Sequence, residues 1–459
     1  MKKIWIALLP VSMVLMATTI HLNQLDNYAG QTLPAYITKD QMPANNPITN
    51  GGATLGRVLF YDKALSANQT ISCASCHKQA FAFGDTAVRS VGLTQGLTGR
   101  HSMRLINTRF ADETHFFWDE RASSLENQTT QPIQDHIEMG FSGQNGQPDL
   151  DSLRRRLSAL PRYQILFPFV FGDSLITEQR IQFALAQFIR SIQSFDSKFD
   201  QGLAQTNNLQ APFPNFTQQE NQGKVLFLNP PPQGGAGCQG CHRAPEFDID
   251  PNTGNNGVTA VAGNPTQNDF TNTRAPSLRD VFNPNGNLNG PLMHNGNFTT
   301  ALQVINHYNV VPQNPQNPNL DQRLQGPGGN LNLNTDQKDA LVAFLKTLTG
   351  SNVYTDPKWS DPFDAQGQIT IVPLLGIPTT PNQAVTLYPQ PAQTFFRLSG
   401  LEAEAPFICF DLQGKNVMEG WLSPNEAVDV SQLQPGNYVL VWQNTKTQSP
   451  IVTKLLIQR

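Results

Sequence analysis

The chain has 459 residues, of which 39% are hydrophobic and only 14% are charged, and its formal net charge is −4. This length allows roughly two to four domains with hydrophobic cores of their own. The charge balance and the lack of a basic stripe exclude a protein that binds nucleic acid through its phosphates. Glycine and proline occur 34 times each, which favours loop-rich domains over a regular helical bundle.

The N-terminal segment has the pattern of a targeting signal. Lys2 and Lys3 precede an apolar run over residues 4–20. Such a run is typical of a secretory signal peptide, and a single uncleaved anchor is the alternative. We therefore expect residues 1–20 to direct export. Residues 21–48 show no hydrophobic period and are predicted to form a linker.

Two copies of one cysteine motif dominate the sequence. Each has two cysteines separated by two residues and followed by a histidine: Cys73, Cys76 and His77 first, then Cys238, Cys241 and His242. This motif is the attachment signal for a c-type haem, in which two thiols form thioethers with the porphyrin and the histidine binds the iron. A zinc knuckle or redox dithiol is disfavoured, because no second cysteine pair lies near either copy. The sequence therefore predicts two covalently bound haem c groups, attached outside the cytoplasm.

The residues around the two motifs also repeat. A short helical pattern leads to each motif, and Phe60 and Phe227 are its corresponding residues. A second phenylalanine follows each histidine, and we pair Phe81 with Phe247. This duplication predicts a mainly α protein with two homologous haem domains in tandem. We expect them at residues 49–205 and 206–352.

Three further segments have a helical period. Residues 174–199 are expected to form one long helix that closes the first haem domain. Residues 300–308 are expected to form a shorter helix. Residues 334–350 are expected to form a helix that closes the second haem domain, with a cap at Asn334 or Thr335.

The composition changes after residue 353, where proline and polar residues dominate as far as residue 380 and predict a linker. Short alternating segments separated by turn residues then predict a small all-β, Ig-like sandwich over residues 381–459. The expected strands are residues 395–398, 407–411, 438–443 and 451–457. Cys409 lies in one of them and is predicted to be a buried, inert thiol.

Several residues could complete the haem sites. Candidate ligands for a sixth iron position near the second haem are Met293, His294, His307 and Tyr308. A pocket that reacts with peroxide needs a base, and a carboxylate beside an apolar haem face has a raised pKa suited to this role. Glu138, flanked by apolar residues, is one candidate, and Glu120 and Glu126 are equally good on composition alone.

The span from about residue 50 to residue 352 resembles the bacterial di-haem cytochrome c peroxidase and MauG superfamily. The resemblance depends on five stretches of this sequence: Leu55-Gly56-x-x-Leu59-Phe60, the two haem motifs, Phe117-Trp118-Asp119-x-Arg121-Ala122, Arg274-x-Pro276-Ser277-Leu278-Arg279 and Met293-His294-Asn295-Gly296. It implies two cytochrome c-like domains with a haem on either side of their interface. The N-terminal haem would react with peroxide, and the C-terminal haem would transfer electrons.

The resemblance also implies roles for individual residues. Trp118 matches the tryptophan between the two haems. Gln128, Pro132 and Glu138 match the spacing of the distal pocket, so Glu138 is expected to be the catalytic acid/base with Gln128 assisting it. Arg279 matches an arginine near the C-terminal haem, where it would contact a propionate.

The sixth ligand of the second haem distinguishes the members of this superfamily. The peroxidases have a methionine fourteen residues after the histidine of the loop that here contains His294, whereas the MauG enzymes have a tyrosine. The corresponding residue is Tyr308. We therefore predict Tyr308 as the ligand opposite His242, with Met293 and His307 as the alternatives.

Two departures from the superfamily concern the first haem. The loop 92–99 lacks the histidine that often blocks the peroxide-reactive haem, so we expect an open iron with His77 as its protein ligand. His101 stands where an asparagine usually contributes to a calcium site between the haems. Ca²⁺ would then depend on backbone groups near Asn289 and Pro291.

The last 80 residues or so resemble the sorting domain of the bacterial type IX secretion system, with an accessory binding sandwich as the alternative. The matching stretches are Leu387-Tyr388-Pro389-x-Pro391-Ala392, Phe410-Asp411-Leu412-x-Gly414-Lys415, Asp429-Val430-Ser431-x-Leu433-x-Pro435-Gly436-x-Tyr438 and Lys454-Leu455-Leu456-Ile457-Gln458. The resemblance implies that the type IX secretion machinery exports the protein through the periplasm to the cell surface or beyond.

Together these resemblances imply a secreted oxidoreductase. Hydrogen peroxide would be reduced at the N-terminal haem, and a small electron-donor protein would supply electrons through the C-terminal haem and Trp118. One alternative is a MauG-like oxidation of a protein or a small organic substrate. A surface cytochrome that transfers electrons without catalysis is the other alternative.

Overall fold

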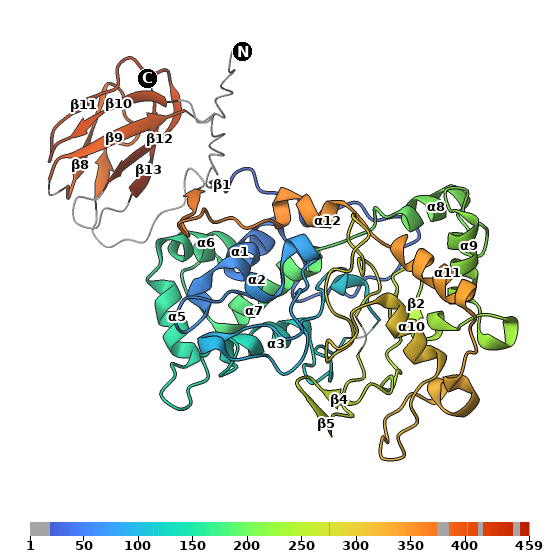
Figure 1. Cartoon of the computed structure of the whole chain (residues 1–459). Helices are drawn as coiled ribbons and strands as arrows, with labels where there is room; N and C mark the ends of the chain where they lie inside the picture. The colour runs from blue at the N-terminus through green and yellow to red at the C-terminus, as the bar shows by residue number, and fades with distance from the viewer. Residues whose placement is uncertain are drawn as a thin grey trace, which may run out of the picture. The chain divides into compact units, whose positions relative to one another are not determined.

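The computed structural model describes residues 19–458, except residues 113, 275, 374–384, 402, 412–415 and 444–449. The chain divides into two compact units (Figure 1). The first contains residues 25–370, and the second contains residues 20–24 and the chain from residue 371 onward. The predicted targeting segment lies outside the described residues, apart from its last two. In the described part of the chain, no helix is long and apolar enough to cross a membrane.

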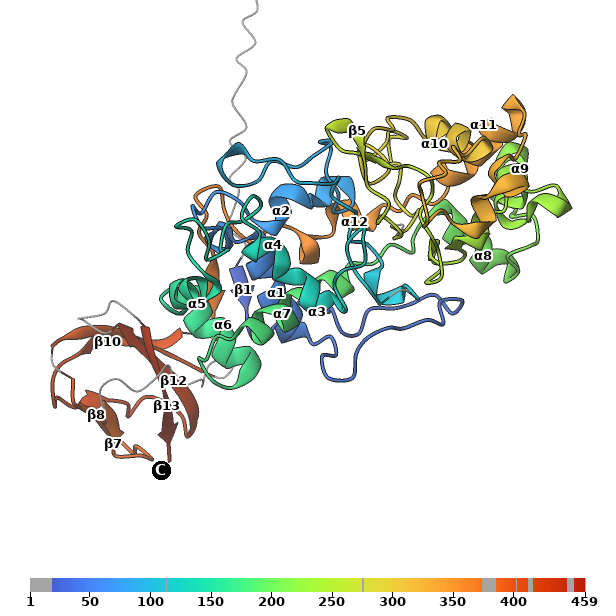
Figure 2. The same ribbon diagram turned by 90° about the horizontal axis from the view of Figure 1, so that it is seen from below.

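The first unit is mostly helical. Its α-helices are α1 (Asn50–Tyr61), α2 (Cys73–Cys76), α3 (Leu125–Thr129), α4 (Gln131–Gln134), α5 (Leu150–Ser158), α6 (Pro161–Phe171), α7 (Glu178–Ser191), α8 (Lys198–Thr206), α9 (Gln218–Leu228), α10 (Ala301–Asn309), α11 (Thr335–Lys346) and α12 (Asn352–Thr355). Two short hairpins pair β2 (His242–Arg243) with β3 (Asp248–Ile249), and β4 (Ala260–Val261) with β5 (Asn264–Asn268). Helices α1 to α7 form one group and α8 to α11 form another (Figure 1, Figure 2).

Helices α1 and α7 cross at the core of the first group. A Cβ atom on Gly56 of α1 would overlap the carbonyl oxygen of Ala184 of α7, so glycine is needed for this approach. Beside the crossing, the rings of Phe60, Phe83 and Phe188 pack with centroids 5.2 to 6.4 Å apart. Phe83 follows the first haem motif, so this cluster attaches the motif to the helix pair.

The second group repeats this arrangement with α9 and α11. A Cβ atom on Gly223 of α9 would overlap the carbonyl oxygen of Ala340 of α11. The rings of Phe227, Phe247 and Phe344 pack with centroids 5.2 to 5.9 Å apart. The packing of the helices is therefore duplicated, as the sequence predicts.

One pairing within the predicted repeat is wrong. The residue that corresponds to Phe247 is Phe83 and not Phe81. Phe83 and Phe247 are both fully buried, and both have a left-handed backbone, with φ of 59° and 57°. Phe81 is only partly buried, so its ring does not fill the equivalent place.

The single long helix predicted over residues 174–199 is also wrong, because the chain forms α7 and α8 with an extended segment between them. Thr177 caps the start of α7, and Ile192 after its end has extended backbone angles. The N–H of Ser194 donates to the side-chain oxygen of Asn107 (2.9 Å), and the carbonyl of Ser194 accepts from the side-chain nitrogen of Asn107 (3.1 Å). These two bonds hold Ser194 outside the helix. Phe199 and Leu203 of α8 then pack in the core of the second group. The boundary expected at residues 205 and 206 stays a prediction.

The other two predicted helices are present, although the second ends at Lys346, four residues before its predicted end. Helix α10 begins after Thr300 and α11 after Asn334, and each cap accepts a hydrogen bond from the backbone three residues on. These caps set the start of the helix that carries Tyr308 and of the helix that supports the second haem motif.

The two segments expected as linkers contain packed residues. Tyr28 is fully buried, and its hydroxyl donates to the carbonyl of Lys358 (2.5 Å). Trp359 is buried as well, and its carbonyl accepts a hydrogen bond from the Tyr61 hydroxyl of α1 (2.7 Å). Residues near 28 and near 359 therefore pack together on α1.

The second unit is built from strands. A four-stranded antiparallel sheet has the order β10 (Asn416–Leu422), β9 (Ala405–Phe410), β12 (Gly436–Gln443), β13 (Pro450–Ile457). A three-stranded sheet has the order β11 (Val428–Asp429), β8 (Phe395–Ser399), β7 (Thr386–Tyr388), and a separate pair joins β1 (Thr19–His21) with β6 (Thr370–Val372).

The two larger sheets of this unit share one buried core, in which Phe396 of β8 contacts Phe407 of β9. Cys409 lies opposite Leu440 and is fully buried. Burial raises the pKa of its thiol to about 11, in agreement with the predicted inert thiol. The predicted all-β character of this region is confirmed, and its Ig-like topology stays a prediction.

Candidate active site

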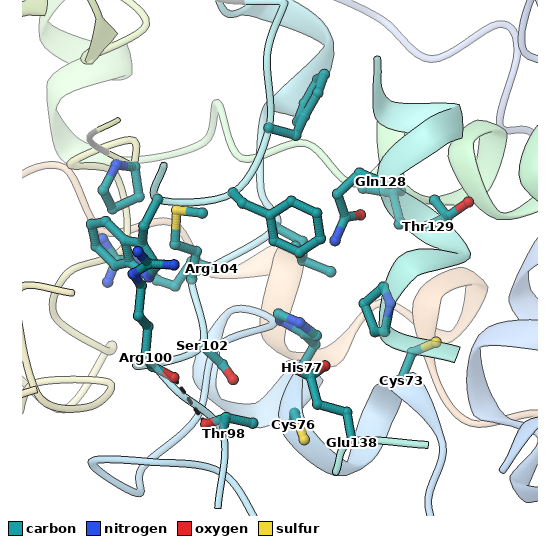
Figure 3. A pocket seen from close by; sticks show the side chains of 18 of the residues that line it. Cys73, Cys76, His77, Thr98, Arg100, Ser102, Arg104, Gln128, Thr129 and Glu138 are labelled. Atoms are coloured by element: carbon teal, nitrogen blue, oxygen red, sulfur yellow. Dashed lines mark hydrogen bonds between the residues drawn. The ribbon is translucent and has the colours of Figure 1, made fainter. Parts of the chain in front are cut away.

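A cavity of about 420 Å³ lies against the first cysteine motif. The short helix α2 presents Cys73 and Cys76 to it, and His77 follows directly at the end of the helix. Figure 3 shows both thiols, the His77 ring and the side chains of Gln128 and Glu138 around the same space. The three residues of the first haem motif therefore face one cavity.

The state of these three side chains suits haem attachment. His77 Nδ1 lies 3.1 Å from the carbonyl oxygen of Phe83 and donates to it, which leaves Nε2 as the nitrogen that can bind a metal. Burial lowers the pKa of His77 and keeps the imidazole neutral, as an iron ligand must be. Burial raises the pKa of Cys73 to about 12 and of Cys76 to about 11, so both are protonated thiols. The residues present therefore fit a haem c group.

A second cavity of about 390 Å³ lies against the other motif, with Cys238, Cys241 and His242 in its lining. Burial lowers the pKa of His242 to about 4 and raises those of the two thiols to about 12 and 11. His242 Nδ1 has no hydrogen-bond partner among the described residues. The donor set matches that of the first cavity, so this site also fits a haem c group.

Two of the candidate sixth ligands meet at the second cavity. The side-chain amide of Asn256 donates to both the Tyr308 hydroxyl and the Met293 sulfur, each at 3.2 Å. Both of these side chains line the cavity. His307 instead bonds the backbone carbonyl of Asn256 (2.7 Å), and neither His307 nor His294 is among the described lining residues. The geometry thus leaves Tyr308 and Met293 as the alternatives.

The first cavity distinguishes the three candidate carboxylates. Glu138 lines it together with Gln128 of α3 and Pro132 of α4. Burial, reinforced by the charge of Asp135 and opposed by that of Arg121, raises the pKa of Glu138 to about 7. Both the protonated and the ionised form of its carboxyl group are therefore accessible near neutral pH.

The two rival carboxylates do not reach that cavity in the described structure. Glu126 forms a two-pronged ion pair with Arg190, at 2.5 and 2.9 Å, and also accepts from Asn46. These contacts hold the pKa of Glu126 below its usual range. Glu120 is absent from the described lining residues. Position therefore favours Glu138 as the acid/base.

Trp118 lies in the wall between the two cavities and lines both. Its indole N–H donates to the carbonyl of His101 (2.7 Å), and its ring meets His294 edge-on with centroids 6.1 Å apart. Arg104 also lines both cavities, donates to the carbonyl of Ser277 (2.8 Å), and has no partner for its Nε among the described residues. Trp118 and Arg104 therefore both belong to the wall between the two cavities.

The prediction that Arg279 reaches a haem propionate is not supported. Arg279 is fully buried, and both of its terminal nitrogens bond Asp200 at 2.8 Å. One of them also donates to the carbonyl of Pro245 (2.8 Å). Arg279 is absent from the described lining of either cavity, because Asp200 already binds its charge.

The calcium site that the resemblance implies stays a prediction, to which His101 does not contribute. His101 offers ring nitrogens where Ca²⁺ prefers oxygen ligands, and its Nδ1 already bonds the carbonyl of Ala87 (2.9 Å). The side-chain nitrogen of Asn289 donates to the carbonyl of Asp280 and to the Tyr354 hydroxyl, and its Oδ1 is buried without a partner among the described residues. No group of three or more His, Cys, Asp and Glu side chains that could hold a metal ion occurs in the described part of the chain.

Sequence reasoning missed Arg104 and Asn256. Arg104 is an isolated charge in a segment without a helical or strand period, and only its position between the cavities makes it notable. Asn256 lies among turn residues and meets Tyr308 from 52 positions away. No local pattern marks either residue.

Comparisons with known proteins agree with this geometry. A protein-family model described as "Di-haem cytochrome c peroxidase" matches residues 50–208, and one described as "Secretion system C-terminal sorting domain" matches residues 386–458. The "Methylamine utilization protein MauG" of Methylorubrum extorquens is 30% identical over 315 residues, which are 67% of this chain and 80% of that protein. The "Cytochrome c551 peroxidase" of Nitrosomonas europaea is 28% identical over 65% of this chain and 80% of that protein.

A solved structure shares the fold of the first unit. It is that of a MauG-like protein associated with microbial copper homeostasis, with a TM-score of 0.58 and 29% identity, and the match covers 72% of this chain and 98% of that one. The MauG relative alone spans two thirds of this chain with 30% identity. The chain belongs to the di-haem cytochrome c peroxidase and MauG family, and it carries a C-terminal secretion sorting domain.

Proposed function

We propose that this protein is an exported oxidoreductase that reduces hydrogen peroxide at the first cavity with electrons that pass through the second. The observation that carries the proposal is the position of Glu138, whose pKa is raised to about 7, in the cavity that Cys73, Cys76 and His77 also line. In this proposal both motifs hold haem c, in domains at residues 49–205 and 206–352. The haem iron would supply the redox centre for cleavage of the peroxide O–O bond.

Glu138 would move the proton that this cleavage requires. As a carboxylate it takes the proton from one peroxide oxygen, and as a carboxylic acid it returns the proton to the departing oxygen. A pKa of about 7 makes both forms available at neutral pH. The amide of Gln128, on the same cavity, can donate a hydrogen bond that orients the peroxide.

Electrons would reach the first site past Trp118, which lines both cavities. Arg104 lies in the same wall with an unpartnered Nε, and Arg279 is absent from the described lining of both cavities, so we assign the haem carboxylate contact to Arg104. At the second cavity His242 and Tyr308 would bind the iron. The electron source in this proposal is a small electron-donor protein.

A MauG-like oxidation of a protein or a small organic substrate is the second candidate. The position of Tyr308 on the second cavity favours it. A phenolate is a hard anionic ligand that stabilises oxidised iron, which makes a haem a poor relay at high potential. The substrate would then supply the electrons itself.

The C-terminal sorting domain supports export through the type IX secretion machinery, to the cell surface or beyond. The apolar run after Lys2 and Lys3 supports an earlier step across the inner membrane. Both steps agree with haem attachment outside the cytoplasm. We therefore propose that the protein works at the cell surface or in the extracellular space.

The test of this proposal is the reaction of the haem-loaded protein with peroxide after Glu138→Gln. The amide keeps the shape of the side chain but cannot exchange the proton, so we expect the rate to fall by roughly 10²- to 10⁴-fold. Glu120→Gln is the matched control, and it should leave the rate unchanged. A Glu138→Gln protein that reacts at the full rate would overturn the assignment. If neither the unaltered protein nor the Glu138→Gln protein consumes peroxide and both pass electrons at the same rate, the protein is an electron-transfer cytochrome.

A further inference from the structure

The loop of residues 90–98 forms a closed structure beside the first cavity. Gly92 N donates to the carbonyl of Gly96 (2.7 Å), and Thr98 N donates to the carbonyl of Ser90 (3.0 Å). Arg89 Nε closes the neck of the loop with a bond to the carbonyl of Thr98 (2.5 Å). The loop therefore holds its own shape, and Gly92 and Thr98 contribute to the lining of the cavity.

This loop is attached to the backbone of Glu138. The N–H of Leu93 lies 2.7 Å from the carbonyl oxygen of Ile137 and 2.9 Å from that of Glu138. On its other side, the N–H of Glu138 donates to Asp135 Oδ1 (2.9 Å). Both polar backbone groups of Glu138 are therefore held, one by the loop and one by Asp135.

The side chains at this contact leave no spare room. A Cβ atom on Gly92 would overlap the carbonyl oxygen of Ile137 and would lie 2.9 Å from the Cα of Glu138. Leu93 is buried, and its Cδ2 would lie 2.5 Å from a Cβ on Gly140. Gly92 has φ of −96°, so the glycine is required for space and not for its backbone conformation.

We propose that the loop of residues 90–98 is a brace, in which Gly92 and Leu93 are positioning residues that set the place of the Glu138 carboxyl group over the first cavity. This inference rests on the proposed role of Glu138. A catalytic acid/base must lie within hydrogen-bond reach of the proton that it moves. A displacement of about 1 Å can cost on the order of 10²-fold in rate. The brace removes that freedom through two hydrogen bonds and a close backbone contact.

The experiment compares Gly92→Ala and Leu93→Ala with Leu97→Ala in the full-length, haem-loaded protein. Leu97 lies in the same loop, but its side chain is exposed, and it is not among the described lining residues of the first cavity. We expect Gly92→Ala to lower the rate with peroxide by about 10- to 100-fold, and Leu97→Ala to leave it unchanged. Leu93→Ala removes the buried side chain without adding an atom and should reduce the rate in the same direction.

Two further readouts separate positioning from a general loss of structure. Gly92→Ala should raise the amide hydrogen exchange of residues 135–140 more than that of the rest of the chain, with unchanged haem spectra. It should also move the midpoint of the pH–rate profile, because Glu138 would shift relative to the two charges that act on it, Asp135 and Arg121. A role in stability alone would leave that midpoint in place.

The outcomes distinguish this inference from the proposed function. If Glu138→Gln is inactive while Gly92→Ala matches Leu97→Ala in rate, exchange and pH profile, the brace is wrong and the catalytic assignment stands. If Glu138→Gln retains full activity, the catalytic assignment fails, and the brace fails with it as a catalytic device. Gly92→Ala with reduced rate and looser residues 135–140 supports both.

Discussion

The two halves of the first unit share a scaffold and differ in what faces each cavity. Gly56 and Gly223 permit the same close helix crossing, and a cluster of three phenylalanines supports each haem motif. The first cavity has the acid/base candidate Glu138. The second has Tyr308 and Met293, both bonded to Asn256. The shared scaffold therefore positions each haem motif, and the segments outside the helix pairs supply the other side chains that face its cavity.

The proximal histidines differ as well. His77 donates to the carbonyl of Phe83, whereas His242 Nδ1 has no partner in the described structure. A hydrogen bond to the second nitrogen makes an imidazole a stronger donor to its metal. The two irons would therefore differ on both faces, which suits one site for reaction and one for electron transfer.

The largest expected effect is a loss of stability when the close helix crossings of the shared scaffold are disrupted. Gly56→Ala and Gly223→Ala each force a methyl group into a backbone carbonyl, and such overpacking costs about 3 kcal/mol. For a unit that contains residues 25–370, the loss corresponds to a fall of roughly 4 °C in the midpoint of thermal unfolding. Calorimetry of both variants checks this, with Val225→Ala, at an exposed position of α9, as the control. Unequal losses would show that the two crossings are not equivalent.

Spacing in the sequence predicts the parts of this protein that are local. Two thiols and a histidine within five residues identify each haem site, and the capping residues Thr300 and Asn334 mark two helices. The break after Ile192 was not predictable, because Asn107 bonds Ser194 from 87 positions away. Asn256 meets Tyr308 only when the second half is folded. Contacts between distant segments carry no local signal.

The next prediction concerns the sixth iron ligand at the second cavity, which distinguishes it from the first. In the proposed site, Tyr308→Met would replace an anionic oxygen ligand with a thioether, which stabilises reduced iron. We expect the potential of the second haem to rise by on the order of 100 mV, more than tenfold in the one-electron equilibrium. Spectroelectrochemistry measures this potential, and the potential of the first haem should stay unchanged.

Met293→Leu and His307→Ala are the controls for this substitution. Neither should alter the ferric spectrum of the second haem if Tyr308 is its ligand. A loss of the ligand spectrum in Met293→Leu, together with an unchanged Tyr308→Phe protein, would assign the position to Met293. That result would bring the second half closer to a peroxidase relay and would remove the observation that favours a MauG-like reaction.

The smallest effect concerns the proton at the first cavity, which has no counterpart at the second. Glu138 accepts a proton only as a carboxylate, and its pKa is about 7. The rate with peroxide should therefore rise as pH increases through about 7.

Asp135→Asn keeps the oxygen that accepts from Glu138 N–H but removes the negative charge that raises the pKa of Glu138. The midpoint of the pH–rate profile should then move to lower pH. Arg121→Gln should move it to higher pH, because Arg121 lowers this pKa. If both substitutions leave the midpoint in place, the group that titrates is not Glu138, and the proton that distinguishes the two halves comes from elsewhere.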